Sequence, residues 1–157
     1  QSFRIVRWLM GGLDITSYKT LISISPMVFI AFGVLMVFSR DLNVISTGIQ
    51  SAMSRGVEVI KVQKIGFIMA SLLTGAVVAL SGPIGFVGLI VPHIVRLIVG
   101  PDLRILLPAS MFFGASFLIM CDTLARTIIA PTEIPVGIIT AMLGGPFFVW
   151  LLKRPKR

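Results

Sequence analysis

The sequence predicts an all-α membrane protein with several transmembrane helices, and three observations support this fold class. Hydrophobic residues make up 56% of the 157 residues and charged residues only 13%, which is far more apolar than a soluble domain. Several apolar runs approach the roughly 20 residues that a helix needs to cross a bilayer. These runs also lack the alternation of polar and apolar residues that a membrane-spanning β-barrel requires.

Five candidate spans lie between the charged segments. The third is the weakest, because it has only 16 residues and contains Pro92, His93 and Arg96. We expect it to be short, tilted or broken, and if it were re-entrant the last two helices would reverse their direction. The expected spans are residues 20–38, 65–81, 84–99, 105–129 and 136–152.

The net charge of +8 predicts the orientation in the membrane. Lys and Arg residues lie between and beyond the apolar runs, without the basic face that phosphate contacts require, so no nucleic-acid partner is expected. Five spans place the two ends on opposite sides, and the side with more Lys and Arg residues faces the cytoplasm. The C-terminus is therefore expected in the cytoplasm of a multi-pass, lipid-embedded inner (cytoplasmic) membrane protein. The cytoplasmic set is Arg40, Arg55, Lys61, Lys64, Arg96, Arg104, Lys153, Arg154, Lys156 and Arg157, and the opposite set is Arg4, Arg7, Lys19 and Arg126.

Residue types that bind metals are too sparse to predict a metal or cofactor site. Cys121 is the only cysteine and lies inside an apolar run, which favours a buried and unreactive thiol. His93 is the only histidine, whereas metal sites combine several ligands, so a structural role is expected. No glycine-rich phosphate loop followed by Lys and Ser or Thr occurs either. The sequence therefore predicts neither an enzyme nor an ATPase.

Residues 40–64 form the longest polar stretch between spans and are expected on the cytoplasmic side. Gly48, Ala52 and Gly56 lie in a short amphipathic pattern that predicts one or two short helices. Gly56 follows Ala52 by four residues, a spacing that suits a helix stop with a left-handed turn. On spacing alone, a solvated connector with a capped helix explains the segment equally well.

Motifs that follow one another along the chain resemble those of the FecCD-type permease family. They read SGPIGFVGLIVPHIVRLIVG from Ser81, PDLRILLPAS from Pro101, DTLAR from Asp122, EIPVG from Glu133 and GGPFFVWLLKR from Gly144. The 40–64 stretch resembles the coupling loop of the same family, so the resemblance covers nearly the whole chain. Within these motifs we identify Gly85, Gly88, Pro92, His93, Arg96 and Asp122 as structural residues.

The resemblance implies a subunit of an ATP-driven importer for iron siderophores, haem or vitamin B12. The family has ten transmembrane helices, so the five spans would correspond to helices six to ten. The chain begins at Gln1 without an initiator methionine or a signal peptide pattern, which indicates an internal or truncated start. The implied partners are ABC ATPase subunits, a periplasmic or lipid-anchored substrate-binding protein, and a second permease subunit in a homo- or heterodimer.

The resemblance also implies a coupling segment over residues 48–57, in which two short helices would fit a groove on the ATPase. Small residues would permit close approach to the partner, and Arg55 would add a polar contact at the rim. The implied contact residues are Gly48, Ser51, Ala52, Arg55, Gly56 and Val57.

Arg126 and Glu133 are the residues that the resemblance implies for docking of the binding protein. An Arg near the membrane surface can hold a carboxylate with two hydrogen bonds. Arg126 also stands four residues after Asp122, so an ion pair within one helix is an alternative that can hold at the same time. For Glu133, the alternative is a charge favoured at the N-terminus of the last helix.

Two other function classes fit the hydropathy of the chain. A fragment of a secondary transporter would need ionisable groups within the membrane that couple to protons or sodium, and only Asp122, Arg126 and the His93–Arg96 pair come close. A non-transporting membrane assembly subunit is the other alternative.

Overall fold

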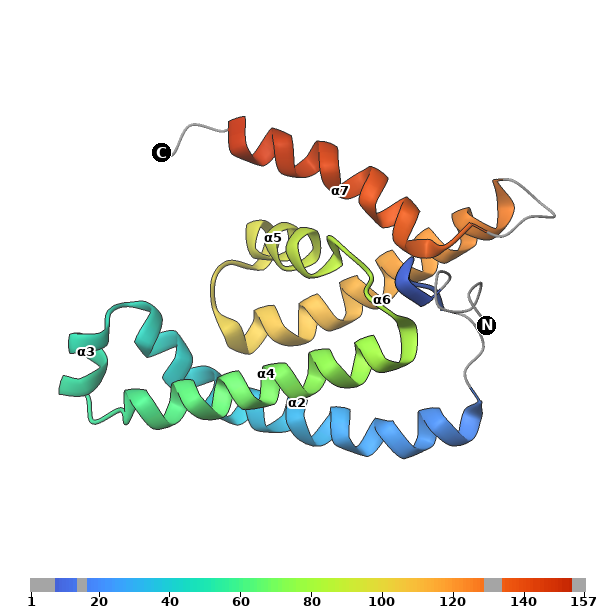
Figure 1. The fold of residues 1–157 in the computed structure, drawn as a ribbon. Helices are drawn as coiled ribbons and strands as arrows, with labels where there is room; N and C mark the ends of the chain where they lie inside the picture. Colours follow the sequence, from blue (N-terminus) through green and yellow to red (C-terminus); the bar gives the residue numbers. More distant parts are fainter. Residues whose placement is uncertain (1–7, 14–16, 129–133, 154–157) are drawn as a thin grey trace.

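The computed structural model describes residues 8–13, 17–128 and 134–153, and the regular elements in these ranges are α-helices (Figure 1). The predicted all-α membrane helix bundle is confirmed. In chain order the helices are α2 (Tyr18–Ser46), α3 (Ile49–Ser54), α4 (Val59–Ser81), α5 (Val87–Val99), α6 (Leu103–Thr127) and α7 (Val136–Lys153).

Four of these helices, α2, α4, α6 and α7, are long and apolar enough to cross a membrane. Helix α2 contains the expected run 20–38 but continues to Ser46, because a helix can extend beyond the apolar run that crosses the membrane. Its last two turns carry Arg40 and Asp41, which water can solvate. Several side-chain hydroxyls bond to a carbonyl of their own helix, as Ser39 does to Met36 at 2.6 Å. Among the described residues, the buried hydroxyl of Ser110 in α6 has no such partner.

Helix α5 is shorter than the run expected for the third span. It has 13 residues, about 20 Å at 1.5 Å per residue, against about 30 Å of hydrocarbon. It begins at Val87 rather than at residue 84, because Gly82 (φ 70°) and Phe86 (φ 66°) have left-handed backbone conformations that interrupt a helix.

The chain nevertheless passes from one end of the bundle to the other between Gly82 and Asp102. At one end the N–H of Gly12 donates to the carbonyl of Ser81 (2.9 Å), the last residue of α4. At the other end the side chain of Asp102 bonds to Asn43 in the last turn of α2. Helix α5 and the non-helical residues before it together make this passage. That the run crosses the membrane stays a prediction.

Helix α4 runs back along α2, and α6 packs against both α2 and α5 (Figure 1). Two clusters of buried side chains hold the second half together. Val91, Val95 and Leu106 join α5 to α6. Cys121 and Ala125 of α6 join Val136 and Ile139 of α7.

Backbone contacts at glycines close the end of the bundle where α4 stops and α7 begins. The N–H of Gly137 donates to the carbonyl of Gly11 (3.3 Å). A Cβ atom on Gly11 would lie 2.7 Å from the carbonyl oxygen of Pro83, and one on Gly82 or Gly137 would collide with the backbone of residues 8–10. Segment 8–13 therefore packs as part of the bundle because these positions carry no side chain.

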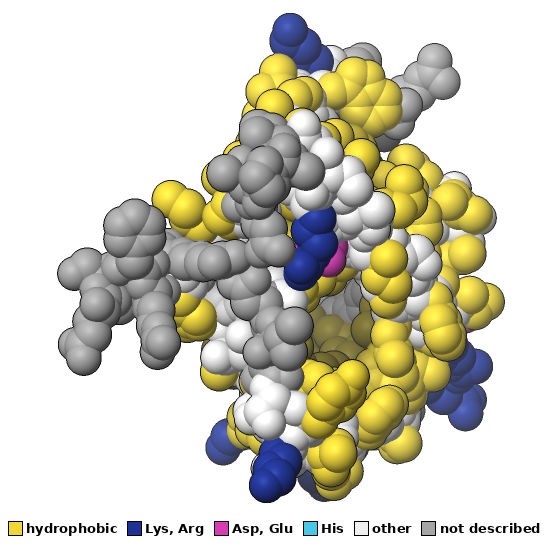
Figure 2. Space-filling model, turned by 90° about the vertical axis from the view of Figure 1, so that its right-hand side faces the viewer, with side chains coloured by type: hydrophobic (Ala, Val, Ile, Leu, Met, Phe, Trp, Pro, Cys, Tyr) yellow, Lys and Arg dark blue, Asp and Glu magenta, His cyan; other side chains and the backbone are white. Residues whose placement is uncertain are grey.

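Large hydrophobic side chains cover much of the surface of the described helices, as the yellow atoms in Figure 2 show. Phe67 is 75% exposed, Phe112 70% and Leu152 69%, on three different helices. Apolar patches of this extent are rare on soluble monomers. They indicate contact with lipid tails or with other membrane helices.

A second close contact joins the start of α5 to α7. The Phe86 ring lies directly on Gly144, and a Cβ atom at Gly144 would collide with that ring. At the next position, Gly145, a Cβ atom would have nothing within 4 Å. Gly144 and Gly145 both lie inside α7, but only Gly144 is packed against another side chain.

We expect Gly144→Ala to destabilise the protein and Gly145→Ala not to do so. The added methyl group at 144 must displace the Phe86 ring, at a cost of about 1–3 kcal/mol. Both substitutions gain the same helix propensity, so their difference isolates the contact. The measurement is the midpoint of thermal unfolding of the detergent-solubilised protein. Equal midpoints for the two variants would contradict this packing.

Candidate functional site

The expected coupling segment forms one short helix, α3, bounded by two glycines with positive φ. Gly48 (φ 134°) precedes α3 and Gly56 (φ 79°) follows it. The N–H of Val57 donates to the carbonyl of Ala52 (3.1 Å) and that of Gly56 to Met53 (3.0 Å). These two bonds are the Schellman pattern that ends a helix at a left-handed residue. The left-handed helix stop predicted at Gly56 is confirmed.

Two expectations for this segment need correction. The resemblance implied two short helices over 48–57, but the described residues contain one, because the turn at Gly56 leads directly into α4. Ala52 was expected to allow close approach of a partner, yet its side chain is fully buried inside this chain. Its small size instead lets α3 pack on α2 and α4. Gly48, Arg55 and Gly56 are exposed, and Ser51 and Val57 are partly exposed.

An open pocket of about 550 Å³ lies between the end of α2, the turn after α3 and the start of α4. Its walls combine the charged side chains of Arg40, Arg55 and Lys61 with apolar ones such as Phe38 and Val62. Lys61 pairs with Glu58 at 3.6 Å, and both side chains are more than half exposed. The surface around α3 is therefore polar at its rim and apolar inside, which suits a protein partner.

A polar contact ties the end of α2 to the start of α6. The side-chain amide of Asn43 donates to Asp102 Oδ1 (2.6 Å), and Asn43 Oδ1 accepts from the N–H of Leu103 (2.9 Å). Asp102 is also the N-cap of α6 and accepts from the N–H of Arg104 (3.0 Å). These hydrogen bonds, first the one from Arg104 and then the one from Asn43, lower the pKa of Asp102.

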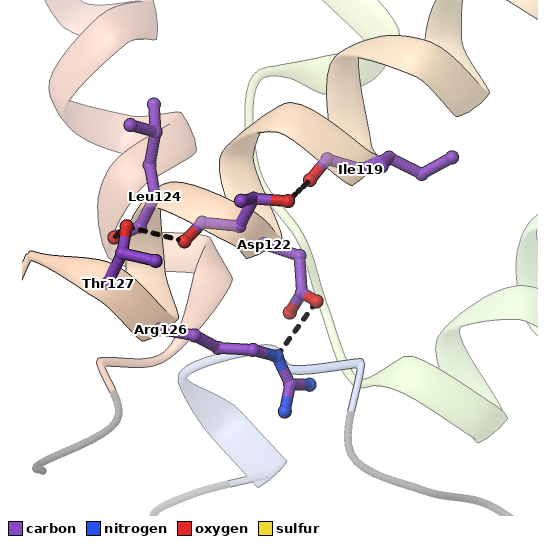
Figure 3. A network of polar contacts seen from close by, with 6 residues as sticks. Ile119, Asp122, Leu124, Arg126 and Thr127 are labelled. Atoms are coloured by element: carbon purple, nitrogen blue, oxygen red, sulfur yellow. Dashed lines mark hydrogen bonds and ion pairs between the residues drawn. The ribbon is translucent and has the colours of Figure 1, made fainter. Parts of the chain in front are cut away.

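Asp122 and Arg126 form an ion pair near the C-terminal end of α6 (Figure 3). Arg126 Nε lies 2.9 Å from Asp122 Oδ2, and the Arg126 side chain is 41% exposed. The intrahelical pairing weighed above is thus present. Figure 2 views the molecule from this side and shows an acidic side chain beside a cationic one, next to a hollow with hydrophobic walls. An exposed ion pair contributes only about 0–1 kcal/mol, so a partner carboxylate can share Arg126 at little cost.

The other motif residues lie on or beside α5. Gly85 and Gly88 are exposed, and a Cβ atom on either would have nothing within 4 Å. Pro92 lies inside the helix, and the His93 ring packs edge-on against Phe147 of α7 with 5.8 Å between ring centroids. Arg96 is exposed in the last turn, where the helix dipole favours a cation. Glu133 lies outside the described residues.

Within the described ranges, no group of three or more His, Cys, Asp or Glu side chains is placed to hold a metal ion. The polar chemistry of those ranges instead gathers at the two ends of the bundle. One end presents α3 and the pocket beside it, and the other presents Asp122 and Arg126.

A sequence profile described as the FecCD transport family matches residues 1–154. The chain is 46% identical to the cobalamin import system permease protein BtuC of Halobacterium salinarum over 93% of its own length, and 41% identical to the hemin transport system permease protein HmuU of Yersinia pestis over 95%. A solved structure titled as an inward-facing conformation of a metal-chelate type ABC transporter superposes with a TM-score of 0.87 and 34% identity, over 95% of this chain.

The chain spans less than half the length of these proteins: 39% of the Halobacterium permease, 45% of the Yersinia permease and 48% of the solved chain. The similarity thus covers nearly all of this chain and one part of each relative.

The contact between Asn43 and Asp102 was not predicted from the sequence as a site. Asp102 carried a local signal, because an Asp after Pro101 and before an apolar run is a typical helix N-cap. Asn43 carried none that would connect it to a residue 59 positions away.

The cap at Asp102 gives the protein a component of stability that depends on pH. Because its pKa is held below the ordinary 3.8, the carboxylate stabilises the folded state at pH values above 3.8, and this stabilisation is lost as the pH falls through the lowered pKa. We expect the thermal midpoint of the wild type to exceed that of Asp102→Ala by a constant amount between about pH 5 and about pH 8, and the gap to close in stronger acid. A gap that widens on acidification would contradict this.

Proposed function

The chain belongs to the FecCD transport family, and on this premise we propose that it is part of the membrane permease of a binding-protein-dependent ABC importer. The importer would move an iron chelate, haem or cobalamin inward, driven by ATP hydrolysis in partner subunits. The observation that carries the proposal is the superposition with a metal-chelate type ABC transporter over 95% of the chain. The chain itself would supply the path and the coupling surface rather than catalysis.

The distribution of charge supports an orientation with α3 and the C-terminus in the cytoplasm. Of the Lys and Arg residues in the described ranges, seven lie toward the end that carries α3 and two lie toward the opposite end, which fits the positive-inside rule. The ATPase subunits would then bind at α3 and the binding protein near Arg126. The two sets are Arg40, Arg55, Lys61, Lys64, Arg96, Arg104 and Lys153, and Lys19 and Arg126.

The geometry of α3 suits a coupling element. It is short, it is closed at both ends by glycine turns, and its buried Ala52 holds it against α2 and α4. A partner that pushes on such a helix moves the long helices behind it, since packed helices shift as units. Gly48, Ser51, Arg55, Gly56 and Val57 would form or shape the contact surface, with Ala52 positioning it from inside.

Arg126 suits the docking of a binding protein on the outer side. Its guanidinium is partly exposed at the surface and is oriented by Asp122, so its direction is fixed before a partner arrives. An acidic group on the binding protein would complete the contact and be steered by charge. Glu133 follows in the sequence and is a second candidate for this surface.

The substrate would be a whole chelate or corrinoid rather than a bare metal ion. The described residues offer no metal ligand set, and relatives are named for cobalamin, hemin and Fe(3+) dicitrate. The exposed apolar faces of α2, α4 and α6 would be covered by lipid, by further helices of the permease and by a second permease subunit. A secondary transporter is not favoured, because the runs 20–39, 65–81 and 105–121 contain no charged residue.

The test of the proposed function is ATP-dependent uptake by the complete permease, reconstituted with its ATPase in proteoliposomes. Radiolabelled cobalamin, haemin and ferric citrate are offered in turn, each with a binding protein that holds it. Accumulation of one of them that needs ATP, the ATPase and the loaded binding protein supports the proposal. Uptake that follows a proton or sodium gradient without ATP would refute it.

We expect Gly56→Val to uncouple ATP hydrolysis from uptake and Gly56→Asn to preserve the coupling. A β-branched residue is strained at φ 79°, so the turn that orients α3 must change, whereas Asn tolerates this conformation. Space is not the limiting factor within this chain, because a Cβ atom there would meet nothing within 4 Å. The measurement is the number of substrates imported per ATP hydrolysed. Equal coupling in both variants would show that the turn is unimportant.

We expect Arg126→Glu to weaken binding of the substrate-binding protein by about tenfold at low salt, because it replaces an attractive charge contact with a repulsive one. The measurement is the Kd of the binding protein for the permease in nanodiscs, at low and at high ionic strength. The effect should shrink as salt screens the charges.

The matched control is Lys19→Glu, which makes the same charge change on an exposed side chain at the same end of the bundle. It should leave the Kd within about twofold, because Lys19 is not proposed to contact the binding protein. Both substitutions change the long-range charge equally, so the difference between their Kd values reports the specific contact at Arg126. Equal weakening by both substitutions would refute a docking contact at Arg126.

A further inference from the structure

The contact between Asn43 and the start of α6 joins segments that lie far apart in the sequence. One amide side chain bonds to the N-cap and to the first residue of α6: it donates to Asp102 Oδ1 (2.6 Å) and accepts from the N–H of Leu103 (2.9 Å). Hydroxyl side chains such as Thr74 and Ser116 instead bond to a carbonyl of their own helix. The Asn43 contact therefore connects helices, and its two bonds fix direction as well as distance.

Helix α6 does not depend on Asn43 for its own cap. Asp102 already accepts from the N–H of Arg104, the usual local N-cap bond. Asn43 adds a second hydrogen bond, because its Oδ1 accepts from the N–H of Leu103. No residue in the first turn of α6 can accept from that N–H. The extra bond attaches the helix start to α2.

This contact lies at the end of the bundle that carries α3, and α6 leads from it to the end that carries Arg126. Asn43 lies in the last turn of α2, five residues before Gly48, where α3 begins. Helix α6 then runs for 25 residues, about 37 Å, and carries Arg126 in its last turn. A displacement of α3 that moves the end of α2 must move the start of α6 as well, or break both bonds.

We propose that Asn43 and Asp102 are positioning residues, whose paired hydrogen bonds transmit movement between α3 at the ATPase surface and α6 at the binding-protein surface. The inference rests on the proposed function, since it assigns a role within that importer. It predicts that the junction governs communication between the two partners rather than binding of either one.

The test is ATP hydrolysis by the permease–ATPase complex in nanodiscs, without and with the loaded binding protein. For Asn43→Leu, which keeps the side-chain size but removes both hydrogen bonds, the basal rate and the Kd of the binding protein should stay at wild-type values. The ratio of stimulated to basal hydrolysis should fall at least about fivefold, the lower end of typical coupling between sites.

Asp102→Ser separates the junction from the stability of α6. Serine is a good N-cap for Arg104 but is too short to reach Asn43. This variant removes one of the two junction bonds and keeps the one from Leu103 to Asn43. We expect a clear but smaller loss of stimulation than for Asn43→Leu, with a thermal midpoint above that of Asp102→Ala. If Asn43→Leu does not assemble with the ATPase, the Asp102→Ser variant carries the test.

The exchanged pair, Asn43→Asp with Asp102→Asn, supplies a rescue. Asn43→Asp alone sets two carboxylates against each other, whereas the exchange restores one amide and one carboxylate with donors and acceptors for all three bonds. Stimulation should be lost in the single variant and recover in the double variant.

Full stimulation in Asn43→Leu or Asp102→Ser would overturn the assignment, and so would a loss that the exchanged pair does not restore. An absence of stimulation in the wild-type complex has a different meaning. It would refute the proposed function, and the role of the junction with it.

Discussion

The hydrocarbon interior of a membrane offers no hydrogen-bond partner to a peptide group, and the rest of this structure depends on that constraint. It leaves helices as the only way for these apolar runs to cross. Among the described residues, it also favours the two ends of the bundle for most irregular segments and nearly every charge. Both proposed partner surfaces are therefore built at helix ends. A movement at one partner surface can therefore be transmitted to the other only through the helices between them.

Close contacts at a few residues then decide how the helices meet. Gly11, Gly82 and Gly137 bring backbones together at one end, and Gly144 admits the Phe86 ring between α5 and α7. At the other end the contact is polar, between Asn43 and the first residues of α6. Small residues and one amide thus determine where the helices contact one another.

The fold class and the helix stop at Gly56 could be predicted from the sequence, because hydropathy and glycine spacing are local signals. The end of α2 at Ser46 and the late start of α5 could not, because an apolar run marks the membrane rather than the helix. Ala52 was expected to face a partner but is buried inside the chain. A small residue gives the same sequence pattern in both cases. The Asn43–Asp102 contact joins residues 59 positions apart, and only the packing of α2 against α6 makes it.

The most direct test of the account is whether α3 and the end of α6 lie on opposite sides of the membrane. In a Cys121→Ala background, Ser54→Cys and Thr127→Cys each place a single thiol at one end of the bundle. A membrane-impermeant maleimide applied to intact spheroplasts should label Thr127→Cys, and should label Ser54→Cys only after the membrane is permeabilised. Labelling of both from the same side would contradict the account.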